Sequence, residues 1–254
     1  SLEFYVNIFG SLTNNLIEPN GSTNYTKGVM INFNGSVISD CNLAMTDVTV
    51  MFNITNLDTG YNDNCTGEHL ANGYYNCTWN SSGKPVGWYQ IEMISNKSGY
   101  NKGYDSITFY LSSAPVLSNP SVSSATGGGG WGASPYNYTI YVTDEDNDTV
   151  IVMFWLKNES VNQWFNPENK SCTSCSNTLT WFNYTYSKYN IDRWYFKFNA
   201  TDEHNNYDET VVQYHNVTKD NVTINLFDGN NSEVNRSSGS VRLAVYVYDQ
   251  DSLQ

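Results

Sequence analysis

Positively charged residues are scarce in this chain of 254 residues. It carries 12 Lys and Arg against 25 Asp and Glu, so its formal net charge is −13. A nucleic-acid partner requires a basic face that releases counterions from the phosphate backbone, and the chain has no basic cluster. The composition therefore argues against nucleic-acid binding and suits a chain that meets salt or divalent cations.

Long apolar segments are also missing. The longest apolar run, residues 150–156, is far shorter than the roughly 20 residues that span a bilayer. The first four residues lack the basic and apolar regions of a signal peptide, so a secreted protein would already have lost its signal. We therefore expect no transmembrane segment in this chain.

Histidine, the commonest general acid and base, occurs only as His69, His204 and His215. None of the three has a partner motif, and we expect each in an ordinary loop or strand position. The glycine-rich segment 127–132 lacks the Lys-Ser/Thr pair of a phosphate-binding loop. No catalytic residue is predicted, so we do not expect an enzyme.

The chain does have an excess of the N-glycosylation triplet Asn-X-Ser/Thr. Eighteen of its 36 Asn residues begin such a triplet, whereas random placement would give about seven. These acceptors are Asn20, Asn24, Asn34, Asn53, Asn64, Asn76, Asn80, Asn96, Asn137, Asn147, Asn158, Asn169, Asn183, Asn199, Asn216, Asn221, Asn230 and Asn235. Because N-linked glycans need an exposed acceptor and a secretory route, we expect an extracellular or cell-surface glycoprotein.

Five cysteines suit an oxidising compartment. We expect a local disulfide between Cys172 and Cys175, because neither the strand-helix context of a redox motif nor a second zinc-binding pair is present. Among Cys41, Cys65 and Cys77, one must stay unpaired or bond outside the chain. Cys65–Cys77 is our first choice because both flank a predicted turn, and Cys41–Cys77 is the alternative.

Three pairs of segments repeat at an offset of about one hundred residues. The pairs are 48–56 with 150–158, 87–95 with 192–200, and 140–146 with 245–251. Apolar and polar residues alternate along these segments, which is the period of a half-buried strand. Short alternating runs between Gly, Asn, Asp and Ser clusters, without helical periodicity, predict an all-β protein of tandem immunoglobulin-like β-sandwiches.

The repeat length predicts the domain boundaries. Residues 1–114 form a first sandwich and residues 115–218 a second, punctuated by the Ala-Pro pair between them. Residues 219–254 supply the first strands of a third, truncated domain. Because a sandwich cannot close with so few strands, we expect a piece of a longer protein in preference to a tail that pairs with a neighbouring molecule.

The segment from Val142 to Val150, followed by residues 192–202, resembles the immunoglobulin-like, PKD-like and cadherin-like repeats of large surface proteins. Residues 76–89 are similar to the β-sandwich repeats of archaeal secreted proteins. Dense sequons without an antibody-type Cys…Trp…Cys framework fit an archaeal coat. The resemblance covers nearly the whole chain and implies a multi-domain surface protein of S-layer or filament type, although such motifs specify fold more than task.

Two acidic loops and the end of the chain offer candidate cation ligands. These ligands are Asp144, Glu145, Asp146, Asp148, Asp202, Asp249 and Asp251. The loops of the second sandwich would meet at one end, where converging carboxylates repel one another unless a cation intervenes. Calcium accepts about six to eight oxygen ligands and is the expected ion; by the cadherin-like resemblance it would stiffen the junction with the preceding domain. The alternative is a solvated acidic turn.

Tryptophan offers a second possible binding surface, because flat rings pack against sugars. Trp88, Trp155 and Trp194 lie on or beside alternating segments and are expected in the core. Trp131 is expected to be exposed. A stacking platform for a polysaccharide, or for the protein's own glycans, would draw on Trp79, Trp88, Trp131, Trp164 and Trp181.

These patterns favour a structural role. We expect a subunit of a heavily N-glycosylated extracellular assembly, an archaeal surface filament or S-layer, that self-associates into a polymer or lattice. The alternative is a cell-surface adhesin or a carbohydrate-binding accessory module of a larger secreted protein. The sequon-free segments 2–16 and 100–136 are candidate contacts, and residues 2–9 are expected to be the first strand of their domain, with strand addition to a neighbour as the alternative.

Overall fold

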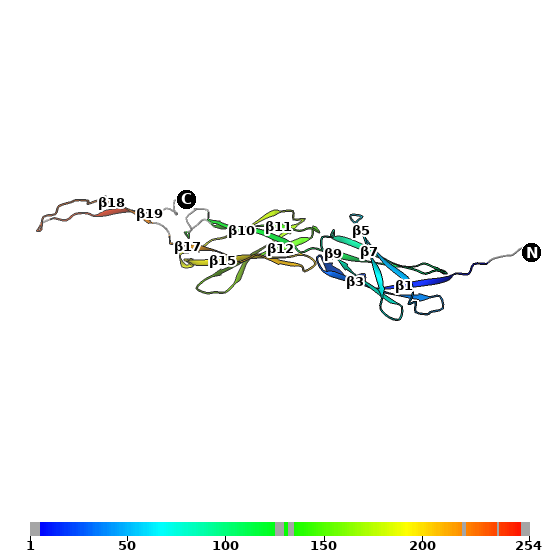
Figure 1. Cartoon of the computed structure of the whole chain (residues 1–254). Helices are drawn as coiled ribbons and strands as arrows, with labels where there is room; N and C mark the ends of the chain where they lie inside the picture. The colour runs from blue at the N-terminus through cyan, green and yellow to red at the C-terminus, as the bar shows by residue number, and fades with distance from the viewer. Residues whose placement is uncertain (1–5, 125–129, 132–134, 220–221, 238, 250–254) are drawn as a thin grey trace, which may run out of the picture. The chain divides into compact units, whose positions relative to one another are not determined.

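The computed structural model describes residues 6–124, 130–131, 135–219, 222–237 and 239–249. These residues fall into two compact units. The first comprises residues 1–115 with the segments 144–148 and 202–206, and the second comprises 116–143, 149–201 and 207–254. Strands dominate both units (Figure 1), and the 3₁₀ turn η1 (Lys188–Asn190) is the one helical segment among the described residues.

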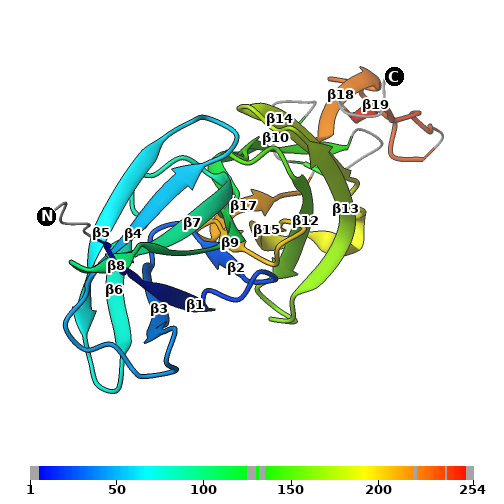
Figure 2. The ribbon, with the colours of Figure 1, turned by 90° about the vertical axis from the view of Figure 1, so that its right-hand side faces the viewer.

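The first unit is a sandwich of nine strands. They are β1 (Gly10–Glu18), β2 (Asn24–Thr26), β3 (Met30–Ser39), β4 (Thr49–Asn56), β5 (Asn62–His69), β6 (Tyr74–Asn80), β7 (Gly87–Asn96), β8 (Tyr100–Asn101) and β9 (Gly103–Ser112). Their hydrogen-bonded order is β2-β9-β7-β4-β5-β6-β3-β1-β8. Strand β5 pairs with β4 over residues 62–67 and with β6 through Glu68 and His69 (Figure 2). One strand is therefore shared by the two layers of an immunoglobulin-like sandwich.

Alternation builds the core of the first unit. Every second residue of β3, from Ile31 to Ser39, is buried, as is every second residue of β7 from its start. The aromatic rings of Phe33, Phe52 and Phe109 are fully buried between the layers. Each such side chain contributes about 2–3 kcal/mol through apolar burial, so the strand period holds this unit together.

Most of the second unit, up to residue 217, is a sandwich of two separate sheets. Its strands are β10 (Val116–Ser124), β11 (Tyr136–Thr143), β12 (Thr149–Asn158), β13 (Phe165–Thr173), β14 (Thr178–Tyr184), β15 (Asp192–Thr201), β16 (Tyr207–Glu209) and β17 (Gln213–Val217). One sheet has the order β10-β11-β14, and the other has the order β13-β12-β15, with β16 and β17 both pairing with β15. This order is also immunoglobulin-like, so the predicted all-β fold class is confirmed.

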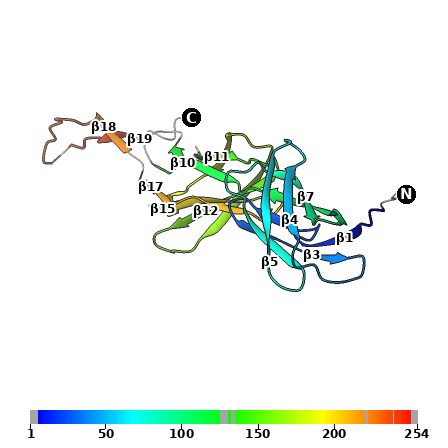
Figure 3. The same ribbon diagram turned by 45° about the vertical axis from the view of Figure 1, so that its right-hand side comes forward.

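The repeated sequence segments occupy equivalent strands of the two sandwiches. In the first unit β4 pairs with β7, and Phe52 lies opposite Met93. In the second unit β12 pairs with β15 (Figure 3), and the register places Phe154 opposite Phe198. All four side chains are completely buried. The sequence repeat is therefore a repeat of the central antiparallel pair of each core.

Strand β10 is irregular at its middle. Its register against β11 shifts between Ser118 and Ser121. Between them, Asn119 has a φ of 55°, a left-handed conformation that Asn tolerates, and Pro120 has no backbone N–H to donate. Because β10 is the outer strand of its sheet, the break falls on an edge.

The ends of the chain depart from the central sandwiches. β18 (Val222–Asp228) and β19 (Ala244–Asp249) form a two-stranded antiparallel sheet, and every residue of β18 is exposed. The predicted three-domain boundaries stay a prediction. At the other end β1 begins only at Gly10, and Val6 and Ile8 are exposed by 82% and 88%. The expectation that residues 2–9 form the first strand is therefore wrong for residues 6–9, since the chain enters the sandwich later; residues 1–5 lie outside the described ranges.

Two disulfides join neighbouring strands and turns. Cys65 on β5 bonds to Cys77 on β6, and Cys172 on β13 bonds to Cys175 before β14. These are the two pairs expected first from the sequence, and Cys41 is left as an exposed free thiol. No helix within the described ranges is long and apolar enough to cross a bilayer.

Candidate functional site

Two loops that are distant in sequence lie together in the first unit. Residues 144–148 connect β11 to β12, and residues 202–206 connect β15 to β16. Each loop turns through an asparagine in the left-handed region: Asn147 has a φ of 63° and Asn205 a φ of 64°. Asn adopts this conformation more readily than other non-glycine residues, so the sequence permits both turns.

Asp202 holds the second loop in shape. One of its carboxylate oxygens accepts the backbone N–H groups of His204 and Asn206, both at 2.8 Å. Its other oxygen accepts the side-chain amide of Asn206 at 2.8 Å, and Asp202 is buried. Its hydrogen-bonding capacity therefore serves the loop itself, which explains why it does not face the cluster described next.

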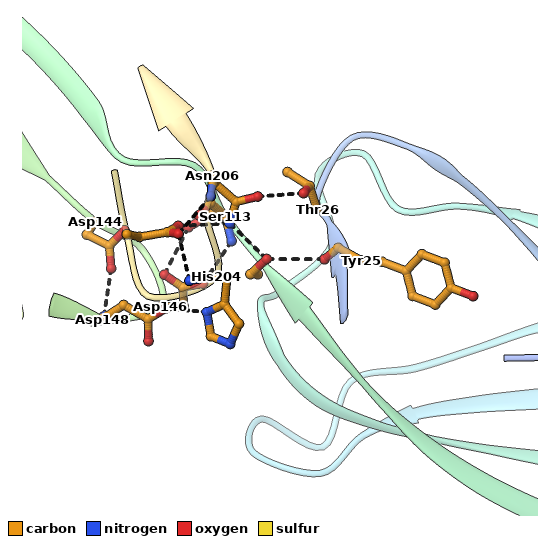
Figure 4. A network of polar contacts seen from close by, with 10 residues as sticks. Tyr25, Thr26, Ser113, Asp144, Asp146, Asp148, His204 and Asn206 are labelled. Carbon is orange, nitrogen blue, oxygen red and sulfur yellow. Dashed lines mark hydrogen bonds and ion pairs between the residues drawn. The ribbon is translucent and has the colours of Figure 1, made fainter. Parts of the chain in front are cut away.

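Three carboxylates and one imidazole gather in these loops (Figure 4). Asp146, Asp148 and His204 each bring a possible ligand atom to within 4.8 Å of the other two. Nδ1 of His204 contacts the carboxylate of Asp148, and the backbone N–H of Asp148 donates to Oδ2 of Asp144 at 2.7 Å. The backbone N–H of Ser113 donates to Asp146 at 2.8 Å. The two loops thus form one polar network.

Asp144 is the most constrained member of this cluster. Its exposed fraction is 4%, and its Oδ1 has no hydrogen-bond partner among the described residues. Burial, together with the neighbouring carboxyl of Asp146, raises the pKa of Asp144 to about 7. A buried carboxylate with an unsatisfied oxygen beside a second carboxylate is a position that a cation would stabilise.

The remaining predicted ligands do not join the cluster. Glu145 is exposed and forms an ion pair with Nζ of Lys27, with an N–O distance of 2.7 Å. Asp202 is engaged within its own loop. Asp249 ends β19 and its side chain is not described, whereas Asp251 lies outside the described ranges. The structure thus brings together Asp144, Asp146 and Asp148 from the predicted set.

His204 is the site residue that the sequence analysis missed. Besides contacting Asp148, its ring stacks on Tyr110, with centroids 4.8 Å apart and an interplanar angle of 16°. The one local signal is its position two residues after Asp202, whose carboxylate accepts the backbone N–H of His204. Its partners come from segments 56 and 94 residues away (204 − 148 and 204 − 110), so no local pattern reveals them.

Sequon asparagines have a common placement in the structure. Asn221 lies outside the described residues, and none of the other seventeen is buried. Within the described ranges the buried asparagines are Asn14, Asn56 and Asn206, and none of them begins a sequon. On the strands, alternation directs the sequon asparagines outward and the apolar neighbours inward.

Three pairs of sequon asparagines lie directly opposite each other across neighbouring strands. The pairs are Asn34 with Asn76, Asn53 with Asn64, and Asn137 with Asn183. Directly opposed side chains on an antiparallel pair are about 5 Å apart at Cβ. In each pair, two potential glycan acceptors are therefore immediate neighbours on the same face of the sheet.

The tryptophans divide differently from the sequence expectation. Trp194 is buried as predicted, but Trp88 is 47% exposed, because β7 directs Tyr89 inward and Trp88 outward. Trp79 is only 4% exposed and belongs to the core, so it cannot contribute to a surface platform. Trp131, expected to be exposed, packs partly buried against the core of the second unit.

Neither a protein-family profile nor a curated protein matches this sequence. Among solved structures, the chain is similar to a tetra-tandem repeat in the extending region of a large adhesion protein, with 16% identity and a TM-score of 0.39. That match covers 95% of this chain and 64% of the other, so the chain spans less than two thirds of that structure.

Two further solved structures share this level of similarity. Dpr2 Ig1-Ig2, in complex with DIP-Theta Ig1-Ig3, is 10% identical, with a TM-score of 0.42 and coverage of 85% of this chain and 70% of the other. The fibronectin(III)-like modules of Clostridium thermocellum CbhA are 13% identical, with a TM-score of 0.31 and coverage of 82% and 95%. The fold class of this chain follows from the strand order and pairing described above.

Proposed function

We propose that this chain is part of a heavily N-glycosylated extracellular structural protein, a surface filament or S-layer subunit of the archaeal type. Tandem immunoglobulin-like sandwiches would supply its length, and glycans its solvation and protease resistance. The observation that supports this most is the placement of asparagine: described sequon positions reach the surface, whereas the buried asparagines lie outside sequons. Occupied sequons require that separation, because a glycan cannot enter a packed core.

Other features support an extracellular, non-enzymatic role. Two disulfides and an acidic, basic-poor composition suit a secreted protein. The polar residues that the structure gathers are engaged in shaping loops, as with Asp202 and its three hydrogen bonds. The sequon-free segments 2–16 and 100–136 remain the predicted contacts for self-association.

We also propose that the acidic cluster takes up calcium. The carboxylates of Asp146 and Asp148, which bring oxygens to within 4.8 Å of each other, would be its ligands, and the buried Oδ1 of Asp144 would be a further oxygen donor, since hard oxygen donors suit this ion. The ion would neutralise the repulsion between these neighbouring carboxylates and fix the two loops. Stiffening of the connection between sandwiches is a further expectation of this proposal.

A second candidate function is adhesion, or carbohydrate binding as an accessory module. Exposed rings favour it: Trp181 is 51% exposed and has Nζ of Lys170 3.8 Å from its ring centroid. This cation–π pair places a charged group beside an aromatic ring, so a sugar could meet a polar and an apolar group at one position. Retention of the monomeric chain on polysaccharide columns, abolished by Trp181→Ala, would favour this reading over a structural one.

Two measurements on native material test the structural proposal. Glycopeptide mass spectrometry should find most of the sequon asparagines modified, and electron microscopy should show regular polymers or lattices. Unmodified asparagines throughout would overturn the glycoprotein assignment. Dispersed monomers that bind polysaccharide would replace the structural assignment with the adhesive one.

A further inference from the structure

The first unit has an aromatic hollow on the outer face of strands β2, β9 and β7. Its volume is about 460 Å³. It is lined by Ser22, Thr23, Asn24, Trp88, Tyr110 and His204. One of these residues, Asn24, begins the sequon Asn-Tyr-Thr. The hollow is therefore bordered by its own potential glycan acceptor.

Strand register places the acceptor and the rings in one row. Asn24 on β2 lies opposite Tyr110 on β9, and Tyr110 lies opposite Trp88 on β7. Residues that face each other across neighbouring strands point to the same side of a sheet. The side chains of Asn24, Tyr110 and Trp88 therefore follow one another across three strands on the outer face.

The rings of this row form a platform with one open surface. Tyr110 stacks on His204 and meets Trp88 edge to face, with centroids 5.3 Å apart at 67°. Trp88 keeps 47% of its surface exposed. The Tyr110 hydroxyl can both donate and accept a hydrogen bond.

We propose that the N-linked glycan of Asn24 folds back onto this platform, with its first sugars packed against Trp88 and Tyr110. The inference rests on the proposed glycosylation and deepens it, because it assigns a resident ligand to one surface. The apolar C–H face of a pyranose would cover the indole ring. The hydroxyl groups of Ser22, Thr23 and Tyr110 border the hollow and suit the polar rim of a sugar.

Reach and linkage favour this glycan over a sugar from another molecule. Neighbouring strands lie about 4.8 Å apart, so Trp88 stands about 10 Å from Asn24, within the span of an asparagine side chain and its first sugars. A covalently attached ligand acts at a high effective concentration, on the order of millimolar, and its binding does not cost the translational entropy of a second, free molecule. An attached glycan therefore occupies the platform ahead of a free one.

A comparison sequon on the same layer lacks such a row. Asn96, at the end of β7, is exposed and lies opposite Thr49 on β4. A glycan on Asn96 would therefore lie beside a polar threonine, whereas a glycan on Asn24 would lie beside the ring of Tyr110. Asn96 therefore provides the matched control for glycan loss without ring contact.

The test is a two-by-two set of variants in the chain purified with its native glycans. Asn24→Gln removes the glycan, Trp88→Ala removes the open ring, and the double variant removes both. Mass spectrometry first establishes occupancy at Asn24. Loss of this glycan should then lower the Tm by about 3 °C when Trp88 is present and by less than about 1 °C when it is absent. Asn96→Gln should shift the Tm equally with or without Trp88.

A second measurement separates the attached glycan from a free one. Released native oligosaccharide, added to the Asn24→Gln protein, should bind at the vacated platform, and the glycosylated protein should not bind it there. Equal Tm losses with and without Trp88, or equal oligosaccharide binding by both proteins, would overturn the inference and leave the proposed function standing. An unmodified Asn24 among modified sequons would do the same. A chain without any glycans would overturn both proposals.

Discussion

The hydroxyl group of Tyr138 lies 2.6 Å from Nε2 of His215 in the core of the second unit. The same hydroxyl lies 2.5 Å from that of Tyr186, and the ring of Tyr136 stacks on the imidazole at 5.1 Å. Burial lowers the pKa of His215 to about 4. The imidazole is therefore neutral at physiological pH and belongs to a buried tyrosine network.

This network predicts a loss of stability in mild acid. In the unfolded chain His215 takes up a proton at about pH 6.5, whereas in the folded chain it takes up a proton only at about pH 4. The contribution is therefore complete above the unfolded pKa and is lost as the pH falls towards the folded one. After allowance for partial exposure, we expect His215 to contribute about 2 kcal/mol less stability at about pH 4.5 than at about pH 7.5. The raised pKa of Asp144 acts in the opposite direction, so the share of His215 is the difference between the native chain and His215→Gln, each unfolded in urea at both pH values.

Substitution of the histidine isolates its share of that pH dependence. His215→Gln should be less stable than the native chain at neutral pH, because the network loses a ring, but should change less between the two pH values. His69→Gln, which alters a histidine packed on Tyr75, should keep the native slope. A native slope in His215→Gln would contradict the prediction.

Calcium should raise the melting temperature of the chain. At a concentration about one hundredfold above Kd, binding to the folded state alone adds about 2.7 kcal/mol. Asp144→Asn keeps an oxygen for the N–H of Asp148 but removes one of the neighbouring negative charges. This variant should melt at or above the native temperature without calcium and should not respond to it.

Glu203→Gln is the matched control for that experiment. It removes one negative charge from the 202–206 loop at an exposed position outside the ligand set, so the calcium response should persist. Calorimetric scans with calcium and with a chelator distinguish the outcomes. A native chain that melts at one temperature in both solutions would exclude the calcium proposal.

Opposed sequons should compete for modification. Asn53 and Asn64 lie across from each other on β4 and β5, where two glycans would crowd one another. We expect one glycan per pair in a given chain, and Asn53→Gln should raise the occupancy of Asn64 above its native level. Quantitative glycopeptide analysis measures both positions. Full occupancy of both asparagines in single chains would refute steric exclusion.

The two disulfides should differ in their contribution to stability. Cys65–Cys77 spans 12 residues and Cys172–Cys175 spans 3, so loop closure predicts about 3 and about 1.5 kcal/mol. Paired Cys→Ser variants, unfolded in denaturant, should follow that order.

A thiol assay on the folded native chain should detect the single exposed thiol of Cys41. More than one reactive thiol would contradict the pairing.

Local periodicity made the central strands predictable. The pair β4–β7 and its equivalent β12–β15 have strict alternation, and their repeat in sequence fixes the same partners in both sandwiches. The outward position of Trp88 was readable from the same pattern. Tyr89, Ile91 and Met93 share the inward phase, and Trp88 belongs to the opposite one. An aromatic residue on a strand belongs to the core only when it lies at the same alternate positions as the strand's buried residues.

Long-range contacts were beyond local reading. Glu145 meets Lys27, 118 residues earlier, and His204 meets both Asp148 and Tyr110. Sandwich topology indicates that the two acidic loops converge, but the hydrogen bonds of Asp202 decide which side chains face the cluster. Likewise, alternation in residues 2–9 indicated a strand, whereas pairing partners for β1 begin only at Leu12 and Gly10.

The interruption in β10 has a consequence for how molecules meet. A continuous outer strand presents a row of free N–H and C=O groups, to which the sheet of another molecule can add. Here Pro120 removes a donor and Asn119 turns the backbone out of register, so the ladder is broken midway. This margin of the second sandwich is therefore a poor template for strand addition, so a self-association contact within residues 100–136 would have to use side chains in place of a shared sheet.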